Sequence, residues 1–540
     1  MLRQTSQKAL PFIIDLLRPS KPTLPEYTRQ TPEARARLYS LAGLATVVAV
    51  GAVYGRLYAT LPPQYLLGLL TPLPVLALLV IWVLPDRDAA PAKAMGSFLL
   101  GFFAVSVAWP DYLALQLPGL PWISVRRVFL LPMCLLLLIC LSTSSDFRNK
   151  MRETLAAEPL LWKILLGFAI AQFLSLAAAA NLGQGVKNFV NFQIAWTAVF
   201  FAAVATFRDE RLQESFLKLF LMAALFIALI AIMERYNQGI LWRNHIPALL
   251  QVDMTETSGA LKSSRRDGVI RIQSVYNNPL PFAEIIALIT PVTLYFIFTC
   301  KRLWSRIALI GADLLFLYVL TLPQSRLGLV GFMISHALFV LVWAGRIWLR
   351  NKFSILGPTI TLAYPVVLIA LAAAVMSVGS LREKVIGGSD TIYSDQTRKL
   401  QRISARGIIL RSPIIGYGPR QGVAVMPKIG FGVHTLDNYY LWIALDYGFL
   451  GFIAYYWMLL LAMHRSFMMA IKDDTRDNNI ALVILSTLTS FLVIKGVLSE
   501  DDNHSLIFMM LGILMGIIWR QKKKEGETAY LPSHRKFAAG

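Results

Sequence analysis

The sequence predicts an all-α, polytopic membrane protein with about 14 transmembrane helices, within a range of about 12 to 14. Hydrophobic residues make up 56% of the 540 positions, and charged residues only 15%. A water-soluble core cannot bury so large an apolar share. The apolar residues also gather in runs of about 18 to 22, the length of a helix that crosses the hydrocarbon layer, whereas a barrel would show short alternating strands.

The apolar runs define one transmembrane domain, residues 39–519, between a cytoplasmic N-terminal tail, 1–38, and a cytoplasmic C-terminal tail, 520–540. The first tail is mostly polar and basic, so no cleavable signal is expected. Two loops, about 234–280 and 379–437, are long enough to carry a function of their own. The runs lie near 39–59, 64–84, 96–115, 128–143, 159–178, 190–206, 214–233, 281–300, 306–323, 327–345, 354–378, 438–462, 480–498 and 505–519.

Lysine and arginine in the short loops set the expected orientation. With the N-terminus in the cytoplasm, the basic clusters of the short loops fall on the cytoplasmic side, as the positive-inside rule requires. Examples are Arg148, Lys150 and Arg152; Arg346, Arg350 and Lys352; and Arg520 to Lys524. Both long loops then face outside. Their arginines would together attract an anion, although long loops are also translocated regardless of charge.

Composition narrows the classes of partner. The net charge is +21, but the basic residues are scattered over membrane loops, so nucleic acid is not expected. Membrane lipids and an anionic lipid-linked substrate fit better. Cys134, Cys140 and Cys300 have no paired spacing, so neither a disulfide framework nor a metal site is indicated. No cofactor is expected.

The second long loop contains a predicted basic amphipathic helix. Arg398, Arg402 and Arg406 recur every four residues and therefore share one face. An apolar stripe lies on another face, formed by Leu400, Ile403, Gly407 and Leu410. The helix is expected to end before Pro413 and to lie on the outer membrane surface or across the mouth of a cavity. Such helices are more often lipid-facing elements than anion sites, and both interpretations are kept.

A turn and a polar triplet follow this helix. The segment Ser412 to Pro419 predicts a tight turn, in which Gly416 and Gly418 adopt angles closed to other residues. His434, Asp437 and Asn438 share a face if the next helix begins early. A histidine is a natural general base, although a lone histidine at a helix start is more often a cap or an interfacial residue.

Charged residues at other outer ends complete the candidate site. Arg326 begins a predicted span, where a charge is costly unless it is paired or used. Arg271 ends the first long loop, in the segment that also holds Asn278. Asp501 belongs to an acidic cluster in which Glu500 or Asp501 could orient a histidine or pair with an arginine; the alternative is a short solvated turn.

The order of these motifs resembles the O-antigen ligase/polymerase family, which are bacterial inner-membrane glycosyltransferases of the GT-C type. The motifs are Ser325 and Arg326 at a helix start, Arg398 before the glycine turn, and His434 before an Asn-Tyr-Tyr-Leu helix. The resemblance covers about Arg271 to Asp501. It implies that Arg326 and Arg398 bind the pyrophosphate of an undecaprenyl-linked glycan donor, and that His434 deprotonates the acceptor hydroxyl.

One feature departs from the ligase pattern. Ligases typically have asparagine or serine directly after the histidine, whereas Thr435 follows here and the pair Asp437 and Asn438 comes later. This form, and the segment Tyr276 to Glu284, look more like the exopolysaccharide and O-antigen polymerase branch, and they make Asp437 a competing base. The expected catalytic residues are His434, Asp437, Arg326 and Arg398, and the expected substrate-binding residues are Arg271, Arg402, Asn438, Asn278 and Asp501.

The sequence therefore favours a metal-independent, inverting glycosyltransferase that polymerises undecaprenyl-pyrophosphate-linked repeat units at the periplasmic face of the bacterial inner membrane. The alternative within the family is an O-antigen ligase, which transfers the polysaccharide to lipid A core or another acceptor. A lipid-linked oligosaccharide transporter and a non-catalytic scaffold are the alternatives of other classes. The expected partners are the donor, a glycan acceptor, membrane lipids and a chain-length regulator.

Overall fold

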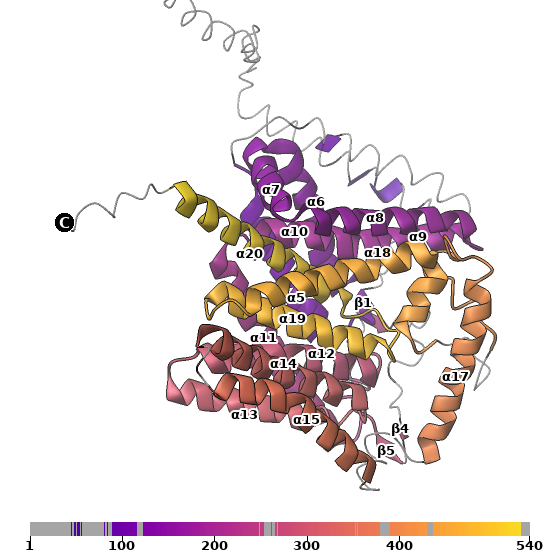
Figure 1. Cartoon of the computed structure of the whole chain (residues 1–540). Coiled ribbons are helices and arrows are strands. Elements are labelled where there is room, and N and C mark those ends of the chain that lie inside the picture. The colour runs from indigo at the N-terminus through magenta and orange to yellow at the C-terminus, as the bar shows by residue number, and fades with distance from the viewer. Residues whose placement is uncertain are drawn as a thin grey trace, which may run out of the picture. The chain divides into compact units, whose positions relative to one another are not determined.

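The structure is a computed structural model of the chain. It describes residues 45, 48–49, 51–53, 56, 80–81, 84, 89–115, 123–247, 249–252, 261, 265–266, 268–351, 353, 355–377, 389–428 and 436–530. Contacts within the chain divide it into two units, Met1–Leu66 and Leu67–Gly540, and the fold below is that of the second unit (Figure 1). Most residues of the predicted spans 39–59 and 64–84 lie outside the described residues.

Helices dominate the described part of the chain, and nine of them are long and apolar enough to cross a membrane. This confirms the all-α polytopic class. In chain order the helices are α5 (Ala92–Ala108), α6 (Val125–Thr143), α7 (Ser145–Ala157), α8 (Pro159–Ser175), η1 (Leu176–Ala178), α9 (Leu182–Phe192), the π-helical turn η2 (Gln193–Ala198), α10 (Val199–Thr206), α11 (Glu210–Asn237), α12 (Pro279–Thr299), α13 (Leu303–Val319), α14 (Arg326–Arg350), α15 (Leu356–Ser377), α17 (Ser389–Ile409), α18 (Tyr439–Ala470), α19 (Arg476–Lys495) and α20 (His504–Tyr530).

Short strands replace part of one predicted span. The run 96–115 is wrong at its C-terminal end, because α5 ends at Ala108 and β1 (Leu113–Leu115) follows. Pro110 explains this end, since it disfavours helical angles at Trp109 and has no N–H to donate. β1 pairs antiparallel with β2 (Ile123–Ser124) and β3 (Leu250–Val252) in the order β2-β1-β3, and β4 (Arg265–Arg266) pairs with β5 (Val269–Ile270).

The core lies among α10, α12, α19 and α20, whose side chains are mostly buried. Small residues let these helices approach closely. A Cβ placed on Gly512 of α20 would lie 2.5 Å from the Cβ of Ala203 of α10, and one placed on Gly331 of α14 would lie 3.0 Å from the Cβ of Ala287 of α12. The long helices therefore run side by side, and α17 crosses one end of them (Figure 1).

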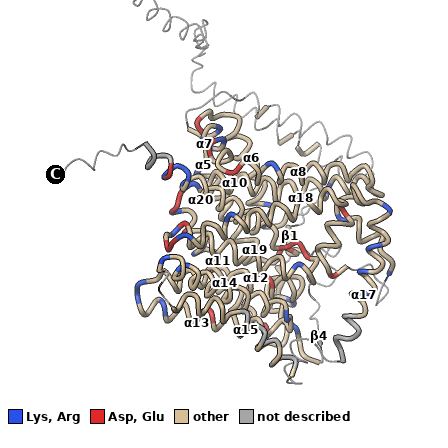
Figure 2. Tube along the Cα trace, viewed as in Figure 1, with Lys and Arg blue, Asp and Glu red and all other residues tan. Residues whose placement is uncertain are grey.

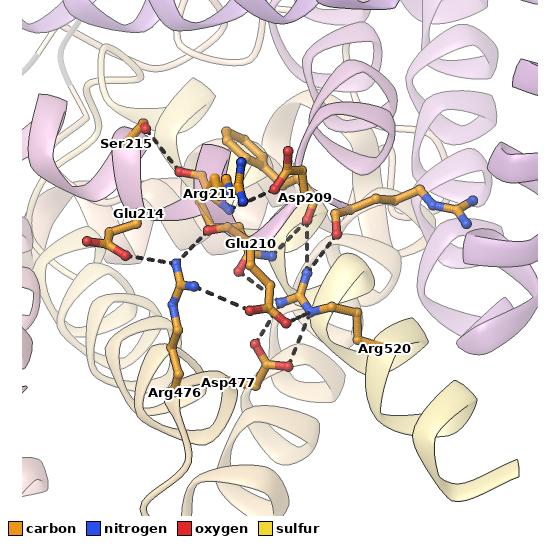
Figure 3. Close-up of polar contacts among 11 residues, drawn as sticks. Asp209, Glu210, Arg211, Glu214, Ser215, Arg476, Asp477 and Arg520 are labelled. Carbon is orange, nitrogen blue, oxygen red and sulfur yellow. Dashed lines mark hydrogen bonds and ion pairs between the residues drawn. The ribbon is translucent and has the colours of Figure 1, made fainter. Parts of the chain in front are cut away.

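Most charged residues lie toward the ends of the long helices (Figure 2). At one end, here called the Arg520 end, Arg520 of α20 donates to both carboxylate oxygens of Asp477 at 2.7 and 3.2 Å and to Gln213 Oε1 at 2.9 Å. Nη2 of Arg476 lies 3.1 Å from Oε2 of Glu214 (Figure 3). These contacts join α11, α19 and α20 at loops that the sequence assigned to the cytoplasm. We call the opposite end the α17 end.

α18 consists of two helices that fold back on each other at Gly448. Its φ and ψ of 61° and −163° are closed to residues other than glycine. Tyr440 therefore stacks on Tyr456 with ring centroids 4.6 Å apart, although a continuous helix would separate them by about 24 Å. The predicted single span 438–462 is wrong. Residues 449–470 are long enough to cross the membrane, whereas 439–447 form a short helix at the α17 end.

The predicted glycine turn fills the break in α18. Gly416 and Gly418 have φ angles of 69° and 97°, which confirms the expected backbone. The N–H of Gly418 donates to the carbonyl of Asp446 at 3.0 Å, and the N–H of Phe449 donates to the carbonyl of Pro413 at 2.7 Å. Backbone groups that the break removes from the helical ladder are thus paired with the turn.

Candidate functional site

A polar pocket opens at the α17 end, where α17, the short first segment of α18 and the turn after α19 meet. Its volume is about 390 Å³, and it is lined by Arg398, Gln401, Arg402, Asp437, Asn438, Leu441, Gly496 and Val497. Four residues that the sequence singled out therefore lie in one pocket: Arg398, Arg402, Asp437 and Asn438.

α17 is the predicted amphipathic helix, and it ends at Ile409, before the proline. Arg398 and Arg402 line the pocket, whereas Arg406, one turn further along, is exposed and outside the lining. Leu400 and Ile403 of the apolar stripe are 53% and 62% exposed, which suits contact with a lipid surface. The helix thus offers one face to the pocket and another to apolar surroundings.

Hydrogen bonds hold the start of α18 against the pocket's other walls. Asn438 caps the helix, because its Oδ1 accepts from the N–H of Leu441 at 3.1 Å. Its Nδ2 donates to the carbonyl of Gly496 at 2.7 Å. The N–H of Asp437 donates to Gln401 Oε1 at 3.2 Å. These bonds fix α17, α18 and the turn after α19 relative to one another.

Asp437 is the carboxylate of this pocket. Its Oδ2 lies 3.9 Å from Nε of Arg398. Burial raises the pKa of Asp437 above its usual range, and the positive charge of Arg398 opposes this rise without cancelling it. A carboxylate of raised pKa accepts a proton more readily than a solvated one, so the pocket combines anion-binding groups with a base.

A buried ion pair fixes the wall formed by Gly496 and Val497. Nζ of Lys495 lies 2.9 Å from Oε1 of Glu284 on α12, both side chains are almost completely buried, and Nζ also donates to the carbonyl of Glu500. Sequence reasoning missed this pair. The signal was present, because the runs 281–300 and 480–498 carry opposite charges near their outer ends.

Arg326 and Arg271 are not among the residues that line the pocket. Arg326 begins α14, and the next residue, Leu327, packs near Ile494 at the end of α19. Arg271 donates from Nε to the carbonyl of Pro323 at 2.9 Å. It therefore anchors the loop that leads into Arg326. The predicted roles of both arginines in binding stay predictions.

Asn278 and Asp501 also lie outside the lining. The Oδ1 of Asn278 accepts from a first-turn N–H of α12 at 3.0 Å, so this residue caps the helix. Asp501 accepts from Arg420 at 2.5 Å, which confirms the expected arginine pairing. Burial raises the pKa of Asp501, but Arg420 and other nearby cations outweigh it and hold the pKa below its usual range.

Sequence reasoning also missed Arg420. Its φ of 58° is uncommon for a residue other than glycine. The buried carboxylate of Asp446 accepts its N–H at 2.6 Å and the N–H of Gly422 at 2.8 Å. The turn that fills the break in α18 therefore also directs a guanidinium toward Asp501.

The expected base His434 falls in residues 429–435, outside the described residues. Its role stays a prediction. The described carboxylate that follows it in the chain, Asp437, does line the pocket.

The comparisons with known proteins concern the segment around this pocket. Residues 311–456 match the family described as O-antigen ligase (Wzy_C). This match supports a relationship of the chain to the O-antigen ligase/polymerase family. No curated protein matches the chain. The apolar helices of the described residues indicate a multi-pass membrane protein. The matched family consists of glycosyltransferase-like membrane enzymes whose substrates are lipid-linked glycans.

The segment that matches the O-antigen ligase family supplies most of the pocket. It contains Arg326, the whole of α17 and the break in α18 at Gly448. Gly496 and Val497 come from beyond it, as does the ion pair that fixes them. The pocket is therefore completed by residues outside the matched segment.

Proposed function

We propose that this protein polymerises undecaprenyl-pyrophosphate-linked oligosaccharide repeat units at the periplasmic face of the bacterial inner membrane. The observation that carries the proposal is the pocket in which Arg398, Arg402 and Asp437 meet at one end of the membrane-spanning helices. The distribution of lysine and arginine assigns this end to the outside. The family match supports a lipid-linked glycan as the substrate.

The arginines bind the pyrophosphate of the donor. A guanidinium stays charged at any relevant pH and offers paired N–H donors to phosphate oxygens. When the anomeric C–O bond breaks, its electron pair leaves with the pyrophosphate, where negative charge grows. Arg398 and Arg402, together with Arg326, stabilise that charge in the transition state. This arrangement needs no metal, and direct displacement inverts the anomeric carbon.

Asp437 takes the proton of the acceptor hydroxyl as its oxygen bonds to the anomeric carbon. The raised pKa of this carboxyl and its place in the pocket support that role. His434 is the competing base that the family resemblance implies. Asn438 contacts the substrate within the pocket, and Arg271, Asn278 and Asp501 contact it around the rim.

The proposal predicts that Arg398→Ala abolishes polymer formation. Loss of one guanidinium that stabilises the leaving group should lower kcat by about 100-fold or more. The measurement is turnover of a lipid-linked repeat unit by the purified protein in nanodiscs. Arg406→Ala is the matched control, because it removes the same charge from the same helix outside the pocket lining, and it should change kcat within about twofold. Equal effects of the two substitutions would contradict the assignment of Arg398.

The ligase reaction is the second candidate, because the matching family is described as O-antigen ligase. It differs in its acceptor, which is lipid A core or another terminal acceptor. The products of a strain that lacks the protein separate the two reactions. Single capped repeats indicate a polymerase, whereas full-length polymer that stays on the carrier lipid indicates a ligase.

A further inference from the structure

The second segment of α18 carries an apolar groove that the candidate site does not use. The groove has a volume of about 560 Å³ and is lined by Ile453, Tyr456, Trp457, Leu460, Leu461 and His464. The spacing of these residues places them along one side of the helix. Ile453, Trp457 and Leu460 are each more than half exposed, at 55%, 55% and 56%. An apolar track therefore runs along a membrane-spanning helix.

Tyr440 links this groove to the polar pocket. Its ring stacks on Tyr456, a groove residue, with centroids 4.6 Å apart and an angle of 10°. Its chain neighbours Asn438 and Leu441 line the pocket. Its hydroxyl donates to the carbonyl of Leu492 at 2.9 Å, which fixes the ring against α19. The fold-back at Gly448 thus brings one end of the groove next to the pocket.

The groove extends from the pocket toward the Arg520 end. At a rise of 1.5 Å per residue, Ile453 lies about 8 Å past Gly448 and His464 lies about 24 Å past it. The hydrocarbon layer is about 30 Å thick. The groove residues therefore span about 16 Å along the helix, roughly half of the thickness of this layer.

We infer that this groove binds the isoprenoid chain of the polyprenyl donor whose pyrophosphate occupies the pocket of Arg398 and Arg402. The inference rests on the proposed function. The pyrophosphate and the hydrocarbon chain of such a donor are covalently joined, so a protein that binds both needs a cationic site at the membrane surface that adjoins an apolar track within the hydrocarbon. The pocket, Tyr440 and the groove provide this sequence of surfaces.

The lining of the groove suits a branched, unsaturated chain. The rings of Tyr456 and Trp457 offer flat apolar surfaces to double bonds and branch methyls, and Ile453 and Leu460 offer branched ones. A phospholipid acyl chain and a partner helix are the other occupants of such a surface. The stack of Tyr440 on Tyr456 brings the groove near a pocket that carries two guanidinium groups, and this favours the chain of an anionic, pyrophosphate-linked lipid.

The test compares donors that differ only in the length of the isoprenoid chain. In nanodiscs, Ile453→Gln with Trp457→Gln should raise KM for an undecaprenyl-linked donor about tenfold, a loss of about 1.4 kcal/mol. KM for a donor with a short, water-soluble prenyl chain should not change, and kcat should stay the same for both donors. The matched control is Met222→Gln with Phe226→Gln, which alters two lipid-exposed positions (65% and 50%) one turn apart on α11.

The possible outcomes distinguish a failure of the groove assignment from a failure of the proposed function. An equal rise in KM for both donors, or no rise for either, would refute the binding of the isoprenoid chain in the groove. Failure of the wild-type protein to use either donor overturns the proposed function, and photo-crosslinking then tests the groove alone. An undecaprenyl pyrophosphate with a diazirine in its isoprenoid chain should label residues 449–470. Labelling that a diazirine phospholipid matches, or labelling confined to other helices, overturns the inference.

Discussion

The ionisation of Asp437 should make the activity of the enzyme depend on pH. Burial raises its pKa above the usual range of an aspartate, and Arg398 only partly opposes this. As a base it must be ionised, so activity should fall as the pH drops through this raised pKa. The acid limb of the profile of kcat against pH should therefore lie above that of an ordinary aspartate. Asp437→Asn should lower kcat at all pH values and remove this limb.

A limb that persists unchanged in Asp437→Asn assigns the base to another group, and His434→Gln is then the informative variant. Asp437→Glu provides the control, because it keeps the carboxylate and should retain an acid limb. The pH profile thus separates the two bases that the sequence left open.

The protonation of Asp502, the residue after Asp501, should affect the stability of the fold. Burial, together with Glu500 and Asp501, raises its pKa to about 7. The folded state therefore holds a proton that the unfolded chain releases near pH 4. Stability from this group is fully present below about pH 4 and is lost as the pH rises through about 7. Asp502→Asn should raise Tm above pH 7 and weaken the decline of Tm between pH 4 and 7.

The measurement is thermal unfolding in nanodiscs across this pH range. Asp146→Asn is the control, because Asp146 is exposed and pairs with Lys150 on the surface of α7. A Tm that falls equally with pH in Asp502→Asn and in the wild type would contradict the assignment.

Sequence reasoning found the residues of the pocket better than the residues that support it. Arg398, Arg402 and Asp437 are recognisable because periodic charge and a polar motif stand out in a hydrophobic chain. Lys495 and Arg420 act through partners far away in the sequence, namely Glu284 and Asp501. Only tertiary packing brings such partners together, so spacing along the chain does not reveal them.

At the level of elements, the fold-back of α18 decides where the pocket lies. Gly448→Ala should destabilise the protein and abolish activity, because its φ of 61° excludes a side chain and a Cβ would clash with the carbonyl of Ile414. The expected loss is about 2 kcal/mol or more. Gly407→Ala on α17 is the matched control, since nothing lies within 4 Å of its Cβ position, and it should be neutral or slightly stabilising.

Thermal unfolding and turnover of the lipid-linked substrate measure both variants. A Gly448→Ala protein with normal Tm and activity would show that α18 tolerates a continuous helix. The sequence could not reveal this break, because glycine is common inside transmembrane helices and the apolar run continues on both sides of Gly448. The deciding contacts come from the turn that holds Gly416 and Gly418.

On the scale of the whole molecule, the Arg520 end holds the helices in place. Arg520→Ala should lower the free energy of unfolding by about 3 to 5 kcal/mol, because it leaves the buried carboxylate of Asp477 without its bidentate partner. Arg520→Lys should lose less, since it keeps the charge but not the planar fork. Lys524→Ala, at an exposed position of the same helix, is the control.

Chemical or thermal unfolding in nanodiscs compares these three variants, and equal stability of Arg520→Ala and Lys524→Ala would refute the role of the ion pair. The basic segments around Lys150, Arg346 and Arg520 meet at this end, as the sequence predicted for segments on one side of the membrane. Hydropathy placed most helices from α6 onward. It could not predict which basic residues are buried, because Arg520 and Lys524 belong to the same charged stretch.

The position of Arg520 in the chain has a consequence for biosynthesis. Asp477, Gln213 and the carbonyl of Arg208 are all made before the residue that binds them. During translation these acceptors have no partner from α20 until Arg520 itself has been made. The contacts that join α11, α19 and α20 at this end therefore form only after α20 has been inserted.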